Sequence, residues 1–190
     1  VGPAVAAAWL ALRAGLALTA RPPHVLLFAF VLVGWLLSVM AHEFGHAWVG
    51  WRAGDHTVKT RGYLEFDPRR YADPVTSLGI PLVALALGGI GFPGGAVYLR
   101  TDLMRGRLWR SAASFAGPAV TAILLLLLAV ALTLWADFGA QNELYPALSL
   151  LAFLQAMALI LNLLPLPGLD GFNILRPFLP AAAAQGLRQI

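Results

Sequence analysis

The sequence predicts an all-α polytopic membrane protein, with about four transmembrane helices, a re-entrant hairpin and a small β element. Three observations support this fold class. The 190 residues are 59% hydrophobic and 12% charged, and their mean hydropathy is +0.76, whereas soluble domains carry roughly 25% charged residues. Apolar runs recur at lengths near those that cross a bilayer. Basic residues gather in the polar stretches between these runs.

Four apolar runs are the candidate transmembrane helices. They cover residues 4–20, 25–51, 112–135 and 146–164. The first run is short, contains Arg13 and has no basic leader, so we expect no cleavable signal peptide. Residues 1–190 are taken as one intramembrane domain, open to truncation at either end. The absence of cysteine excludes disulfides, thiolate metal ligands and a cysteine nucleophile.

Two segments interrupt the helical pattern. Residues 52–76 form a polar loop, in which Val58, 62–66 and the pair Asp67-Pro68 favour one or two short strands and a turn, a β insertion. Residues 77–99 are apolar but carry many glycines and prolines, which a regular spanning helix rarely contains.

Loop charge favours a re-entrant path for residues 77–99. A single crossing would place the basic stretches 52–76 and 100–110 on opposite sides, against the positive-inside rule. It would also separate Asp170 from residues 42–46. A segment that enters and returns is tolerated where protein covers its backbone. Both basic stretches then face the cytoplasm, and Asp170 arrives at the depth of residues 42–46.

The sequence His-Glu-Phe-Gly-His at residues 42–46 lies inside an apolar run. On a helix, HExxH places His42 and His46 one turn apart on one face, where both imidazoles can bind one zinc ion. Glu43 is then placed to act as general base on a water activated by the metal. The plainer alternative is a helix with two incidental histidines. Ionisable groups are costly in hydrocarbon, and this favours the metal site.

Catalytic zinc usually takes three protein ligands, and HExxH supplies two. Asp55 and His56 follow the helix in a polar loop, whereas Asp170 is the only acidic residue of the last apolar part of the chain. Prolines and glycines flank Asp170 and would interrupt the helix there, which can turn its carboxylate inward. Asp170 is therefore the candidate third ligand. The alternative is an ordinary loop aspartate at a helix end.

The motif HEFGH, followed far downstream by NLLPLPGLDG, resembles the site-2 protease family of intramembrane zinc metalloproteases. Gly54-Asp55, Arg61-Gly62-Tyr63-Leu64 and Asp73-Pro74 resemble the segment after the catalytic helix in the compact branch without a PDZ domain. Ala116-Gly117-Pro118 resembles the AGP helix start of that family. The likeness covers residues 25–175. One departure is Thr121, because the family often has Asn three residues after the AGP proline.

The resemblance implies one zinc ion per chain, bound by His42, His46 and Asp170, with Glu43 as base. It implies a multi-pass enzyme of a bacterial plasma membrane, with its active site toward the cytoplasm, that cleaves the transmembrane segment of a membrane-protein substrate in regulated intramembrane proteolysis. The alternative is a catalytically inactive zinc-binding membrane scaffold. The presence of Glu43 argues against it, because metal binding does not require this residue.

Two groups of residues are candidates for substrate binding. Gln155 and Asn162 are seven apart, hence on one helical face. They could form interhelical hydrogen bonds, or Asn162 could orient substrate or stabilise an oxyanion. Gly95, Val97 and Tyr98 follow a Gly/Pro break and favour a strand edge to which an unwound substrate adds by backbone pairing. The alternative is a loop that only closes the hairpin.

Other functions fit the sequence less well. The net charge of +4 is explained by basic loops, and no nucleic-acid partner is expected. Serine-type intramembrane proteolysis lacks a GxSxG nucleophile site, and the aspartyl type lacks a second membrane aspartate. A different membrane zincin would need another intramembrane glutamate besides Glu43. A zinc transporter would need a longer path of acidic or histidine residues.

Overall fold

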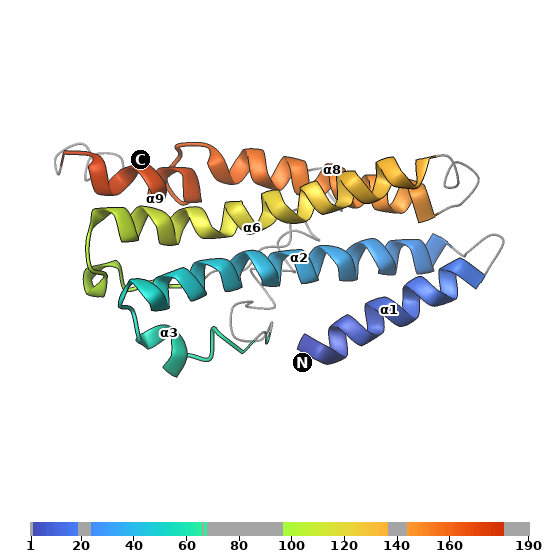
Figure 1. Cartoon of the computed structure of the whole chain (residues 1–190), viewed down its shortest axis with the longest axis horizontal. Helices are drawn as coiled ribbons and strands as arrows, with labels where there is room; N and C mark the ends of the chain where they lie inside the picture. Colours follow the sequence, from blue (N-terminus) through green and yellow to red (C-terminus); the bar gives the residue numbers. More distant parts are fainter. Residues whose placement is uncertain (1, 19–23, 66, 68–96, 137–143, 181–190) are drawn as a thin grey trace, which may run out of the picture.

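A computed structural model describes residues 2–18, 24–65, 67, 97–136 and 144–180. Four long helices lie along the molecule (Figure 1): α1 (Gly2–Leu18), α2 (His24–Ala53), α6 (Arg107–Leu134) and α8 (Leu144–Leu163). The shorter elements gather at one end: α3 (Thr57–Thr60), η2 (Thr101–Leu103), α9 (Asp170–Leu175) and η3 (Arg176–Phe178). None of the described residues forms a strand.

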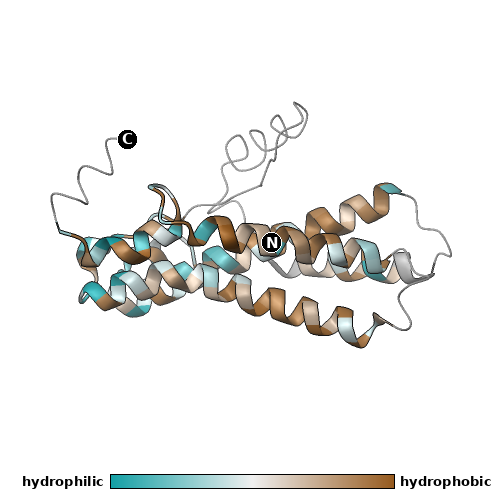
Figure 2. Cartoon of the chain, turned by 90° about the horizontal axis from the view of Figure 1, so that it is seen from above, coloured by the Kyte–Doolittle hydropathy of each residue, from teal (hydrophilic) through white to brown (hydrophobic). Residues whose placement is uncertain are grey.

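Within the described part of the chain, three helices are long and apolar enough to cross a membrane. These are α2, α6 and α8, with mean hydropathies of 2.3, 2.5 and 2.0 over their best windows. Helix α1 has 17 residues, fewer than the roughly 20 that span a bilayer. Large apolar side chains are exposed along the spanning helices, among them Leu127, Leu134 and Phe153. Figure 2 shows hydrophobic residues along most of the helices, with hydrophilic residues concentrated toward one end. The mostly helical fold is thus as predicted, and three of the four expected spans correspond to helices that could cross a membrane.

Helix α2 is the central element of the bundle, since it packs against α1, α6 and α8. Phe30 is fully buried, stacks on Trp9 with 4.9 Å between ring centroids, and packs with Leu144 and Leu148. Farther along α2, a Cβ at Gly45 would collide with the backbone carbonyl of Ala116. Small residues thus let α2 and α6 approach closely at the level of the HExxH motif.

The predicted β element is not found in the described part of residues 52–76. Val58 lies in the helical turn α3, and residues 61–64 form turns. Asp55 explains the local conformation, because its Oδ1 accepts hydrogen bonds from the Thr57 N–H at 3.1 Å and the Thr57 hydroxyl at 2.6 Å. Such a side-chain-to-backbone bond closes a turn directly after α2 and competes with strand formation. Residues 68–76 lie outside the described part.

The AGP sequence is not a helix start in this structure. Helix α6 begins at Arg107, and Pro118 lies in its interior. Proline lacks an N–H, so it is easiest to place in a first turn, which explains the expectation. Here the interior position is accommodated within a closely packed stretch of α6, where Ala116, Gly117 and Pro118 are all buried.

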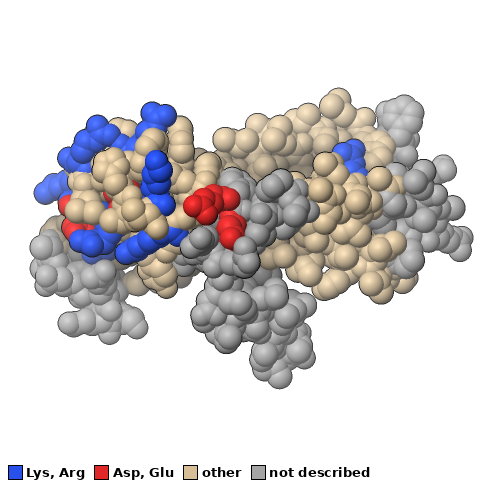
Figure 3. Space-filling view, turned by 90° about the horizontal axis from the view of Figure 1, so that it is seen from below, with Lys and Arg blue, Asp and Glu red and all other residues tan. Residues whose placement is uncertain are grey.

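The described parts of the two basic stretches, residues 52–65 and 100–110, lie together at one end of the molecule. The N–H of Arg105 donates to the carbonyl of Ala53 at 3.0 Å, which joins the end of α2 to the segment before α6. Figure 3 shows most of the visible basic side chains gathered at this end, which we call the basic end. The proposed re-entrant segment 77–99 lies outside the described residues except for residues 97–99. Residues 53 and 105, on the described parts of the two basic stretches, meet at the same end.

Candidate metal centre

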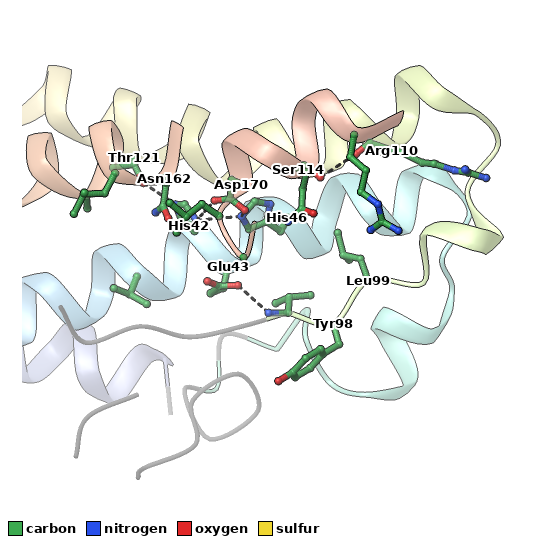
Figure 4. Close-up of a pocket in the computed structure, with 18 of the residues that line it drawn as sticks. His42, Glu43, His46, Tyr98, Leu99, Arg110, Ser114, Thr121, Asn162 and Asp170 are labelled. Atoms are coloured by element: carbon green, nitrogen blue, oxygen red, sulfur yellow. Dashed lines mark hydrogen bonds and ion pairs between the residues drawn. The ribbon is translucent and has the colours of Figure 1, made fainter. Parts of the chain in front are cut away.

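His42 and His46 lie one turn apart on the face of α2 that meets α6 and α9 (Figure 4). Their Nε2 atoms are 3.1 Å apart. Both side chains are buried, and Glu43 between them is 6% exposed. The spacing of HExxH and the helix geometry of α2 therefore bring both imidazoles to one point, as predicted.

Asp170 completes the group from the distant end of the sequence. Its Oδ2 lies 3.1 Å from Nε2 of His42, and its Oδ1 lies 3.3 Å from Nε2 of His46. The chain turns back after α8 through Gly168, whose φ of +94° favours glycine. At Gly171 a Cβ would collide with the carbonyl of Leu163. Two glycines thus allow the tight return that aims Asp170 at the histidines.

The three side chains have the geometry of a zinc site. Two ligand atoms bound at about 2.1 Å to a tetrahedral metal lie about 3.4 Å apart. The two Nε2 atoms are 3.1 Å apart, and each lies 3.1 or 3.3 Å from one of the two Asp170 carboxylate oxygens, which is close to this value. Two imidazole nitrogens and one carboxylate also match the donor set of catalytic zinc, which leaves one position open. His42, His46 and Asp170 can therefore hold one zinc ion.

Hydrogen bonds on the outer side of each imidazole fix its orientation. Nδ1 of His46 donates to the carbonyl of Ala113 at 2.8 Å, and Nδ1 of His42 lies 2.8 Å from the hydroxyl of Thr121. Nδ1 of each imidazole is thus engaged on the side away from the centre, and its Nε2 faces Asp170. Outer partners of this kind orient metal-ligating histidines and raise their basicity.

Gly117 provides the space for the centre on the α6 side. A Cβ at this position would collide with the Nε2 atoms of both His46 and His42. Gly117 and Thr121 are four residues apart, so they lie on the same face of α6 as Ala113. One face of α6 thus supplies both outer hydrogen-bond partners and the clearance for a bound ion.

The side chain of Asp170 is a negatively charged carboxylate, which suits it to bind a cation. Burial favours its neutral form, but hydrogen bonds with His42 and His46 outweigh this effect and lower the pKa of Asp170 to about 2. The carboxylate is therefore ionised at neutral pH, which is the form that ligates metal.

Glu43 has a partner outside the histidine group. Its Oε2 accepts a hydrogen bond from the backbone N–H of Val97 at 3.0 Å (Figure 4). Val97 was predicted to offer its backbone to substrate, and this N–H is bound to Glu43 in the structure. The carboxylate of Glu43 is therefore held beside the three metal-binding side chains by the segment 97–100.

Segment 97–100 is fixed to the basic end by two further contacts. Asp55, which is fully buried, accepts the Arg100 N–H with Oδ2 at 2.6 Å, and Arg61 donates to the carbonyl of Tyr98 at 3.0 Å. Peptide groups alternate in direction along extended backbone. One edge of the segment is thus tied to Asp55 and Arg61, while the edge of Val97 faces Glu43.

A cavity of about 1070 Å³ opens over the centre. Asn162, Val97 and Tyr98, three of the predicted substrate-binding residues, line it together with Glu43. Gly95, the fourth, lies outside the described residues. Gln155 also lines the cavity and is 2% exposed. The structure thus brings Asn162, Gln155 and the segment 97–99 to one space beside the metal-binding group.

Sequence reasoning did not identify the outer partners of the histidines. Thr121 was noted only as a departure from a family pattern, and Ala113 carried no signal because its backbone carbonyl is the interacting group. The spacing of Ala113, Gly117 and Thr121 places them on one helical face. That spacing is the available signal, but it becomes informative only once α6 is known to pack against the HExxH helix.

The fold and the cluster define a helical protein with three described helices that could cross a membrane and three side chains that could hold a metal ion. Known proteins agree with this class. The chain is 50% identical over 176 residues to "Putative zinc metalloprotease Rip2" of Mycolicibacterium smegmatis, covering 92% of this chain and 65% of that protein. It is 51% identical over 152 residues to the protein of the same name in Mycobacterium tuberculosis, covering 80% and 58%.

A more distant relative is "Putative zinc metalloprotease YwhC" of Bacillus subtilis, 28% identical over 169 residues that cover 86% of this chain and 75% of the relative. No family model and no solved structure matches the chain. The chain is a homologue of these proteins named as zinc metalloproteases, which confirms the resemblance seen in its motifs and the expected zinc cofactor. It spans less than two thirds of the length of the two Rip2 relatives.

Proposed function

We propose that the chain is an intramembrane zinc metalloprotease of the site-2 type, which hydrolyses a peptide bond in or near a transmembrane segment of a membrane protein. One observation carries the proposal. His42, Glu43 and His46 lie within a helix long and apolar enough to cross a membrane, and Asp170 joins them beside a cavity. Such a group in a membrane-spanning helix is costly unless it is used.

Each residue of the site has a proposed role in hydrolysis. His42, His46 and Asp170 would hold the zinc ion, which when bound supplies Lewis acidity for a carbonyl and activates a water. Glu43 accepts a proton from that water and can pass it to the leaving amine, as a general base and then acid. Val97 orients Glu43 through its N–H. Thr121 and the carbonyl of Ala113 keep both imidazoles in the ligating orientation.

The substrate must enter the cavity unwound, because the peptide bonds of a helix are shielded by their own hydrogen bonds. An unwound segment needs partners for its N–H and C=O groups inside a membrane. We propose that Asn162, Gly95, Val97 and Tyr98 supply them. The N–H of Val97 can do so only if Glu43 releases it, so pairing at Val97 would coincide with freeing the carboxylate for proton transfer.

Reconstitution in liposomes tests the function. Purified protein loaded with zinc is mixed with a single-span membrane protein, and the products are mapped by mass spectrometry. We expect a cut within or next to the apolar segment of the substrate. A protein that instead cleaves only soluble unfolded polypeptides would be a metalloprotease of another kind.

The second candidate function is a zinc-binding membrane scaffold without catalytic activity. Thr121 motivates it, because the family often has Asn at this position. The contact of Thr121 with His42 argues for an intact centre, since the hydroxyl reaches Nδ1 at 2.8 Å. A scaffold would hold zinc and bind membrane proteins but cut none of them.

A further inference from the structure

Arg110 lies at the basic end of the cavity over the metal-binding group. It is located on the first turns of α6, seven residues before Gly117, which is about 10 Å along the helix axis. Figure 4 shows its guanidinium group pointing toward Leu99, and both residues line the cavity. Peptide bound across the centre and leaving toward the basic end would therefore pass this side chain.

The Nε of Arg110 is buried and has no hydrogen-bond partner among the described residues. Buried polar atoms of this kind are rare and call for an explanation, because a donor removed from water without a partner destabilises the fold. A ligand that accepts a hydrogen bond at this point would remove that cost.

The surroundings of Arg110 favour an anionic ligand. Arg107 and Arg176 line the same cavity, and no ion pair within the described part of the chain involves any of these three arginines. Asp102, on the segment just before α6, forms its ion pair with Arg100 and has only a longer-range electrostatic interaction with Arg110. Three cationic side chains without ion-pair partners among the described residues thus face one space, and a guanidinium binds a carboxylate in a planar, two-pronged geometry.

We propose that Arg110 is a specificity-determining residue that binds a carboxylate of the substrate. This carboxylate belongs to the part of the peptide that runs from the cleaved bond toward the basic end. The inference rests on the proposed function and adds a substrate class to it. An extended peptide advances about 3.3 Å per residue, so the preferred acidic residue lies about three residues from the cut. Substrates with Glu or Asp there would be selected over those with neutral or basic residues.

A lipid phosphate is the other anion available to a membrane protein. Arg52 is exposed at the same end outside the cavity and suits headgroup contacts, whereas the Arg110 Nε is buried and Arg110 lines the cavity that contains Glu43. This location favours a group carried by the bound peptide. The experiment separates the two sources.

Binding is measured first, on zinc-loaded Glu43→Gln protein in detergent micelles, with labelled transmembrane peptides. The two peptides of a pair are identical except at one position, which is Glu in one and Gln in the other. Successive pairs place this position about two to five residues from the expected cut. We expect the Glu peptide to bind about tenfold more tightly at the favoured position. Arg110→Gln should reduce this preference to near unity, and Arg110→Glu should favour a Lys peptide instead.

Arg52→Gln is the matched control, because it removes one positive charge at the same end outside the cavity. It should keep the preference for the Glu peptide. Cleavage by protein with intact Glu43 is then measured on the same peptides and should follow the same order. If zinc-loaded protein shows the binding preference but cuts no peptide, the proposed function fails while the assignment of Arg110 stands.

Two results would overturn the assignment. One is equal binding of Glu and Gln peptides at every position. The other is an Arg110→Gln variant that weakens both members of a pair alike. If Arg110→Gln weakens the binding of both peptides equally, and the size of this loss depends on the phosphatidylglycerol content of the micelles, the occupant is a lipid headgroup.

Discussion

The backbone N–H of Val97 donates to the carboxylate of Glu43 at 3.0 Å, and it joins two segments 54 residues apart. The proposed general base is therefore oriented by a backbone group that no side-chain substitution at Val97 would remove, except proline. The same N–H belongs to the edge proposed to receive substrate. One hydrogen bond thus links the position of Glu43 to the occupancy of the cavity.

Val97→Pro tests this link. Proline removes the N–H, and the loss of a hydrogen bond to a charged group is worth about 1.5 to 3 kcal/mol, so we expect cleavage to fall at least about tenfold. Val97→Ala keeps the N–H and should have a mild effect. Zinc content, measured by atomic absorption, should be unchanged in both. Wild-type cleavage by Val97→Pro would show that this bond has no part in the reaction.

Thr121→Val tests the orientation of His42. Valine matches threonine in shape but cannot pair with Nδ1, which now lies 2.8 Å from the hydroxyl. Loss of an outer partner typically costs about 10- to 100-fold in metal affinity or activity. Thr121→Ser keeps the hydroxyl and should retain most of the affinity, measured by zinc competition with a chelator. Equal affinities for the two variants would separate Thr121 from the metal site.

Gly117→Ala should exclude zinc by placing a methyl group against the Nε2 atoms of His42 and His46. Gly106→Ala, directly before the same helix, is the control, because a Cβ there meets nothing within 4 Å and its φ of 170° is ordinary extended backbone. We expect zinc to be lost from the first variant and kept by the second. Full zinc content in Gly117→Ala would mean that α6 does not approach the centre this closely.

The relative positions of the basic stretches can be tested by labelling. Thr60 and Asp102 are both exposed, and the chain has no cysteine. Thr60→Cys and Asp102→Cys should react with an impermeant thiol reagent from the same side of the membrane, which we expect to be the cytoplasmic side. Reaction from opposite sides would contradict the arrangement in which the Arg105 N–H meets the Ala53 carbonyl.

The sequence predicted best what depends on spacing within one helix. His42 and His46 converge because α2 fixes residues four apart on one face. Asp170 could be proposed because a carboxylate in apolar surroundings is costly unless a cation or another partner binds it. The groups around these ligands depend on how α6 packs against α2. The sequence alone does not show that the Ala113 carbonyl or Gly117 has such a role. The strand expected at Val58 failed because Asp55 makes local hydrogen bonds that close a helical turn instead.

The most direct test of the account measures zinc content and cleavage together in three proteins: wild type, Glu43→Gln and Asp170→Ala. Wild type should hold one zinc ion per chain and cut a single-span substrate. Glu43→Gln should hold zinc and cut nothing, because it loses the base but no ligand. Asp170→Ala should lose both zinc and activity. Full zinc occupancy and full activity in Asp170→Ala would contradict the assignment of the third ligand and with it the proposed centre.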